Sequence, residues 1–144
     1  IDLSREMLAV ARANLERADC GNCQVRQADL YQLPLPDAVF DAVTVHQVLH
    51  FLDEPATAIA EAARVLAPGG KLVVVDFLPH GQESLRQEHE HRRLGFSDKE
   101  IASWFGRAGL DTKKTEHLSG TPLTVAVWLA EKPPIDPKRE APTS

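Results

Sequence analysis

Apolar residues along the chain follow two kinds of spacing, and the two alternate. In some segments they recur every three or four positions, which predicts amphipathic helices, and in others they form short β-branched runs, which predict buried strands. Ser4 and Ser97 stand where two helices are expected to begin, and Gly21 and Gly109 where they end. The first half of the chain is predicted to form a strand ending near residue 2, a helix over 5–19, strands over 23–28 and 39–45, and a helix from about 53 to 66. The Pro-Gly-Gly turn at 68–70 is expected to stop that helix. The second half is predicted to form a strand over 71–77, helices over 82–93 and 98–108, and strands over 111–118 and 123–130.

This order predicts an α/β fold with a doubly wound, mostly parallel sheet. The connection between the last two strands is too short for a parallel crossover, so these strands are expected to form an antiparallel hairpin. We expect one domain over residues 1–131 and a disordered tail over 132–144, because the tail has almost no residues that could form a core. Residues 1–3 resemble the end of a strand, so we also expect a strand to be missing upstream of Ile1.

Composition and charge narrow the classes of function. The 144 residues carry a formal net charge of −5, and Lys and Arg are scattered, which argues against a nucleic-acid-binding surface. No apolar run has the length that crosses a bilayer, and no signal peptide opens the chain, so a cytoplasmic location is expected. Cys20 and Cys23 form a C-x-x-C pair, but without a second ligand pair we expect no metal site, and Cys23 is interpreted as a small residue that opens a strand.

Polar residues that directly follow strands are the candidate functional residues, because ligands of open α/β sheets bind at the carboxyl ends of the strands. Four places qualify: Asp2, Asp29, His46 and residues 76–80. Asp2 could accept hydrogen bonds from both hydroxyls of a ribose, or could simply be an acid at a helix start. Asp29 could accept from an adenine amino group, or could simply form a turn. Together the two acids favour an adenosine site.

Three stretches of sequence carry a family resemblance. They are Asp2-Leu3-Ser4 followed by Met7-Leu8, then Asp29-Leu30 before Leu33-Pro34 and Phe40-Asp41, and then Ala63-Arg64-Val65-Leu66 before Pro68-Gly69-Gly70-Lys71-Leu72. Over residues 1 to about 131 the chain resembles the class I S-adenosylmethionine-dependent methyltransferases, which have a Rossmann-like fold. It looks most like the small-molecule group that contains the ubiquinone and menaquinone biosynthesis enzymes. The segment from His89 to Asp98 resembles a narrower set, in which such a domain follows an arsenic-repressor-like winged-helix regulator.

The resemblance implies S-adenosylmethionine as the cofactor and a small molecule as the methyl acceptor. By position, Asp2 would bind the ribose with Leu3 and Met7 near the adenosine, Asp29 and Leu30 would address the adenine edge, and His46 would border the methionine portion. The resemblance identifies no catalytic residue. The family's first strand and glycine-rich turn would precede Ile1, so we expect residues 1–144 alone to bind the cofactor poorly and to be inactive.

Several alternatives stay open at this stage. His46 and His50 are four residues apart, and a metal pair or a general base is conceivable there, although His50 is expected to be a half-buried loop residue. His80, His89 and His91 could belong to a lid over the acceptor or to a solvated face. A nicotinamide-dependent oxidoreductase would also use an acid at residue 2, but it does not fit the terminal hairpin. The main alternative is a non-catalytic cofactor-sensing or dimerising domain of a transcriptional regulator, and a homodimer is left open.

Overall fold

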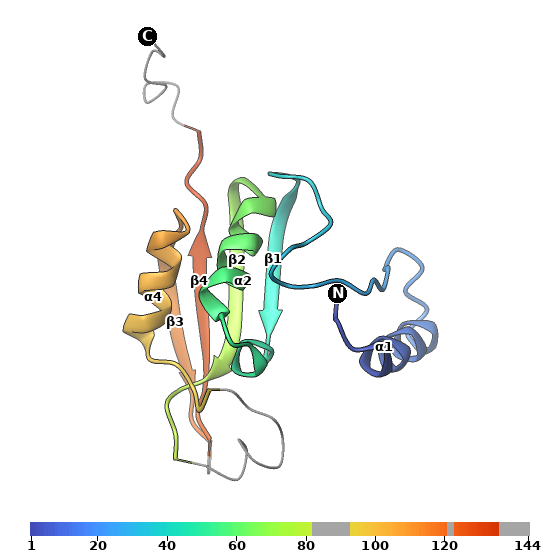
Figure 1. Ribbon diagram of the computed structural model, residues 1–144, viewed down its shortest axis with the longest axis horizontal. Helices are drawn as coiled ribbons and strands as arrows, with labels where there is room; N and C mark the ends of the chain where they lie inside the picture. The colour runs from blue at the N-terminus through green and yellow to red at the C-terminus, as the bar shows by residue number, and fades with distance from the viewer. Residues whose placement is uncertain (82–92, 121–122, 136–144) are drawn as a thin grey trace. The chain divides into compact units, whose positions relative to one another are not determined.

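The computed structural model describes residues 1–81, 93–120 and 123–135, and these residues form two compact units (Figure 1). The first unit comprises Ile1–Leu35, and the second begins at Pro36.

The first unit is built around helix α1, Arg5–Arg17. The Ser4 hydroxyl accepts a hydrogen bond from the Met7 amide, so Ser4 is the N-cap that the sequence predicts. The helix ends earlier than predicted, because Ala18 is the C-cap and Asp19 takes the left-handed conformation (φ 52°) expected of Gly21. A single Asp residue can adopt this conformation at modest cost.

The predicted strand over residues 23–28 is not formed as a continuous strand. A single parallel bridge joins Asp2 to Gln27, through hydrogen bonds from the Asp2 amide to the Arg26 carbonyl and from the Ala28 amide to the Asp2 carbonyl. The prediction was too long, because only Gln27 of this segment pairs with the residues before α1. Cys23 is exposed here and opens no strand, so that interpretation was also wrong.

The second unit contains a four-stranded sheet in the order β1-β2-β4-β3. Strand β1 (Phe40–His46) pairs in parallel with β2 (Leu66–Phe77), and β4 (Val125–Glu131) pairs antiparallel with both β2 and β3 (Asp111–Leu118). Three of the four strands therefore run in one direction, and the predicted antiparallel terminal hairpin is confirmed. Within the described part of this unit β1 pairs with β2 only, and the strand expected upstream of Ile1 stays a prediction.

Two helices pack on one face of this sheet, α2 (Pro55–Val65) and α4 (Asp98–Arg107), and a short 3-10 helix, η1 (Leu49–Phe51), follows β1 (Figure 1). Alternate residues of the two central strands face the helices, as the two-residue side-chain period of a strand requires. This layer is the core of the unit. Its buried strand residues are Leu72, Val74, Asp76, Ala126, Trp128 and Ala130, and its buried helix residues include Ala58, Ile59, Ala62, Ala63, Ile101 and Phe105.

Helix α2 ends before the predicted stop. Its last residue is Val65, and β2 begins at once with Leu66, so the Pro-Gly-Gly turn at 68–70 lies within β2 as an irregularity and does not stop the helix. A Cβ atom on Gly70 would lie 2.8 Å from the Ala67 carbonyl oxygen and 3.0 Å from that of Phe40. Glycine is therefore required here by the close approach of the Ala67 and Phe40 carbonyl groups.

Several predictions fall outside the described residues. The helix expected over 82–93 lies there except for Arg93, and so do His89 and His91. The same holds for residues 136–144 of the expected tail. Lys132, which the sequence analysis assigns to that tail, exchanges backbone hydrogen bonds with Gly69 and Gly70 and so continues the ordered chain beyond β4.

Candidate functional site

Asp2 lies directly before helix α1 and is partly buried. Its Oδ1 accepts a hydrogen bond from the Ser4 amide at 2.9 Å, which makes the residue part of the helix entrance. Among the described residues no group donates to its Oδ2. The carboxylate thus has a local structural role through one oxygen and keeps the other available for a ligand donor.

Asp29 has the same arrangement at the start of the next loop. Its Oδ1 accepts from the Tyr31 amide at 2.9 Å, and within the described residues its Oδ2 receives no hydrogen bond. Asp29 is exposed, and Leu30 beside it is half-buried. The turn-forming role and a ligand-binding role are therefore compatible, since they use different oxygens.

The two acids lie on neighbouring backbone segments that run in parallel, Asp2 within the bridge and Asp29 just beyond it. Because Asp2 bridges to Gln27, the chain at Asp29 leaves the same end of this small pair as Asp2 does. Two carboxylates at one end of a parallel pair can address one ligand, as the sequence analysis requires for an adenosine.

An open groove of about 600 Å³ in the first unit brings some of the predicted residues together. Asp2 and Met7 line it, beside apolar side chains of α1 and Val25. Leu3 and Asp29 are not among its lining residues. Leu3 and Met7 are 62% and 56% exposed, so both present apolar surface for contact with a ligand or with other protein surface.

His46 is the last residue of β1, is exposed, and pairs in register with Val75 of β2. The next residue, Gln47, has a positive φ of 51°, and its amide donates to the Val75 carbonyl at 2.7 Å. A left-handed conformation in a non-glycine residue is uncommon and is often found at functional sites. The chain thus turns sharply after the strand that presents His46.

His50 differs most from its prediction, because it is almost completely buried and not half-buried. Its Nδ1 lies 2.8 Å from Oδ1 of Asp76, which is fully buried in β2. The Phe77 amide donates to the same oxygen at 2.9 Å, and the Phe51 and Phe77 rings lie against the imidazole. The sequence analysis placed Asp76 among residues that follow strands but did not pair it with His50. The signal for the pair was a His and an Asp inside apolar runs, just after β1 and near the end of β2, where parallel strands bring such residues together.

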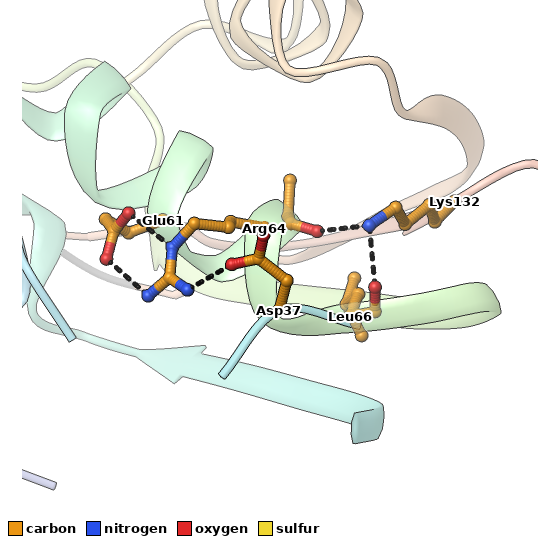
Figure 2. Close-up of polar contacts among 6 residues, drawn as sticks. Asp37, Glu61, Arg64, Leu66 and Lys132 are labelled. Carbon is orange, nitrogen blue, oxygen red and sulfur yellow. Dashed lines mark hydrogen bonds and ion pairs between the residues drawn. The ribbon is translucent and has the colours of Figure 1, made fainter. Parts of the chain in front are cut away.

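The polar contacts at the opposite end of the same sheet, near the amino ends of β1 and β2, are ion pairs and a helix cap (Figure 2). Arg64, in the last turn of α2, binds Glu61 at 2.8 Å and Asp37 at 2.6 Å, and the hydrogen bonds that it donates to these two carboxylates raise the pKa of the guanidinium further. The Lys132 ammonium donates to the carbonyl oxygens of Ala63 and Leu66, at 3.0 and 2.7 Å. Lys132 therefore caps the C-terminal end of α2, where carbonyl groups lack partners within the helix. This end holds a structural cluster and no predicted site residue.

Other candidate chemistry finds no support in the described residues. Cys20 and Cys23 are free thiols, and no cluster of three metal-ligating side chains occurs in the described ranges. His46, at the end of a strand, and His50, buried against Asp76, do not form a ligand pair. None of the described helices has the length and apolar character needed to cross a membrane.

Comparison with known proteins decides the family. The family described as methyltransferase domain matches residues 1–74, which is just over half of the chain. The chain belongs to the methyltransferase domain family. The match spans all six predicted cofactor-binding residues, from Asp2 to His46.

A curated relative of this methyltransferase-family chain is the demethylmenaquinone methyltransferase of Thermus thermophilus, 42% identical over 80 residues. The alignment covers 54% of this chain and 35% of the relative, and the chain spans about a third of the length of the curated relatives it matches.

Two solved structures show the fold. A geranyl diphosphate methyltransferase in complex with S-adenosylmethionine is 13% identical with a TM-score of 0.74, and the match covers 91% of this chain and 66% of that one. The (4+2)-cyclase SpnF is 20% identical with a TM-score of 0.78, covering 92% and 64%. The predicted Rossmann-like α/β class is confirmed. Because one of these neighbours is described as a cyclase, the fold by itself does not determine the reaction.

Proposed function

We propose that the full-length protein transfers a methyl group from S-adenosylmethionine to a small-molecule acceptor in the cytoplasm. The observation that carries the proposal is the family match over residues 1–74, because it contains both acids at the ends of the parallel pair. The name of the Thermus relative, a demethylmenaquinone methyltransferase, favours a small molecule over a macromolecule as acceptor.

The proposed cofactor contacts use groups that the fold leaves available. Asp2 would accept from the ribose hydroxyls through the oxygen that Ser4 does not occupy, and Leu3 and Met7 would pack beside the adenosine. Asp29 and Leu30 would contact the adenine edge, and His46 would border the methionine portion. The sulfonium supplies an already activated methyl group, so the protein's task is to align the acceptor and exclude water. A general base is required only where the acceptor's pKa demands one.

Isothermal titration of the full-length protein with S-adenosylmethionine and S-adenosylhomocysteine tests the cofactor site. We expect Asp2→Asn to weaken binding at least about 10-fold, since a charge-assisted hydrogen bond contributes about 1.5–3 kcal/mol, and Asp29→Asn to weaken it less. Asp41→Asn removes the same charge from an exposed position on β1 and is the matched control, with unchanged affinity. Equal affinities of all four proteins would contradict the proposed site.

Methyl transfer from labelled S-adenosylmethionine tests the reaction. The acceptor panel includes demethylmenaquinone, the compound in the name of the Thermus relative, together with unrelated small molecules. Labelled product from at least one small molecule is expected. Cofactor binding without transfer to any acceptor would contradict the proposed reaction and favour a cofactor-sensing domain.

A further inference from the structure

The His50–Asp76 pair is a polar contact inside an apolar core. His50 is 3% exposed and Asp76 is 0% exposed, and their side chains meet at 2.8 Å. Since a carboxylate can only accept, Nδ1 of His50 is the donor when Asp76 is ionised. Oδ1 of Asp76 thus receives two hydrogen bonds, from His50 and from the Phe77 amide.

The second carboxylate oxygen of Asp76 makes this pair unusual for an apolar core. Oδ2 of Asp76 is buried and has no hydrogen-bond partner among the described residues. A buried polar atom without a partner is rare and costly, and buried ion pairs are often no better for stability than apolar side chains of similar size. Folding stability alone therefore does not account for this pair.

The position of the pair suggests its role. His50 lies in η1, on the segment that leaves β1 after His46, and Asp76 lies in β2, next to the residue that pairs with His46. The hydrogen bond from Gln47 to Val75 and the contact from His50 to Asp76 attach this segment to β2 at two points. The His50 carbonyl also accepts from the Arg93 amide, so the segment is attached to the chain before α4 as well.

We propose that His50 and Asp76 are positioning residues that hold the segment after β1, and with it His46, in the orientation required for methyl transfer. This inference rests on the proposed function and adds two residues that act on the site through the backbone. Both are buried, so neither is assigned a contact with the cofactor or the acceptor.

Two substitutions of His50 distinguish the loss of its hydrogen bond to Asp76 from the loss of its imidazole ring. In His50→Asn the amide nitrogen can occupy the place of Nδ1 and donate to Asp76, whereas in His50→Gln it lies near the place of Nε2 and cannot. We expect His50→Gln to lower kcat for the acceptor identified in the panel by about 10- to 100-fold, because small misplacement of reacting groups has effects of this size. His50→Asn should retain kcat within about threefold and leave KM for S-adenosylmethionine unchanged.

A third variant covers the case in which His50→Gln does not fold. The double substitution His50→Leu with Asp76→Leu removes both polar groups, so no buried charge is left alone and folding is retained. We expect this variant to be stable and still low in kcat. Stable protein with wild-type kcat would show that the pair is only structural and would overturn the inference.

The exposed pair His117–Asp98 is the matched control. Its His Nε2 and carboxylate oxygen are 3.0 Å apart, and both side chains are more than 40% exposed. Substituting His117 by Asn or Gln should leave kcat unchanged. A loss like that of His50→Gln would mean that the assay reports general destabilisation, and the inference would be wrong.

A readout independent of activity separates this inference from the proposed function. Amide hydrogen exchange at Gln47 should be faster in His50→Gln than in His50→Asn, because the segment loses one of its attachments. Equal exchange in the two variants would overturn the positioning role even if the protein transfers methyl groups. Absence of transfer by the wild-type protein, together with the expected exchange difference, would instead refute the proposed function.

Discussion

The two ends of the four-stranded sheet use polar side chains in opposite ways. At the amino ends of β1 and β2, Arg64 and Lys132 bind carboxylates and helix carbonyls at the surface or partly exposed to it. At the carboxyl ends, His50 and Asp76 are buried together, and one oxygen of Asp76 has no partner in the described part of the chain. The first end satisfies groups that any helix end leaves open, whereas the second introduces polar groups that the fold does not require. This difference is the reason for assigning a positioning role to the second end and a stabilising role to the first.

The largest effect should come from separating the buried pair. His50→Leu leaves the Asp76 carboxylate buried without its partner, so we expect the free energy of unfolding to fall by about 3–5 kcal/mol. The double variant with Asp76→Leu should regain most of this loss, because no buried charge remains. Urea unfolding followed by circular dichroism measures both. A double variant as unstable as the single one would mean that the shape of His50 matters more than its hydrogen bond, and the contrast between the two ends would weaken.

Sequence reasoning succeeded at the strongly patterned elements. The apolar run at 71–77 and the Ser97 start of α4 were predicted closely, since buried strands and N-caps have local signatures. It failed where tertiary contacts set the boundaries. Lys132, distant in sequence, caps α2 and lets it pass directly into β2, and no local pattern around residues 66–70 reveals this.

For the candidate site, the sequence predicted where the residues lie along the chain, and their binding roles stay predictions. Asp2, Asp29 and His46 were selected because they were expected to follow strands. In the structure Asp2 is itself bridged to Gln27, Asp29 lies two residues beyond Gln27, and His46 is the last residue of β1. His50 was not assigned to Asp76, because burial of a His depends on the partner across the sheet and not on its neighbours in sequence.

The second expected effect on stability concerns Lys132, near the amino ends of β1 and β2, and should be smaller than the first. Lys132→Met removes the donor to the Ala63 and Leu66 carbonyls but keeps a long apolar stem, so we expect a loss of about 1–2 kcal/mol in the free energy of unfolding. Lys114→Met is the control, since its ammonium is exposed and forms a surface ion pair with Glu116, and no measurable change is expected. A loss for Lys132→Met as large as that for His50→Leu would show that both ends contribute equally to stability.

The smallest expected effect concerns the exposed pair His117–Asp98, which serves as a comparison for the buried pair His50–Asp76. Burial opposes ionisation of Asp98, but hydrogen bonds from His117 and Trp128 outweigh it and lower the pKa of the carboxyl. A carboxyl whose pKa is lower in the folded protein stabilises it above the unfolded-state pKa of about 3.9, and this contribution is lost as the pH falls through the folded-state value. Asp98→Asn should therefore reduce stability at pH 7 slightly and flatten its decline below about pH 4. Unfolding midpoints measured from pH 2 to 7 test this, and an unchanged acid limb would mean that the exposed pair, unlike the buried one, is energetically silent.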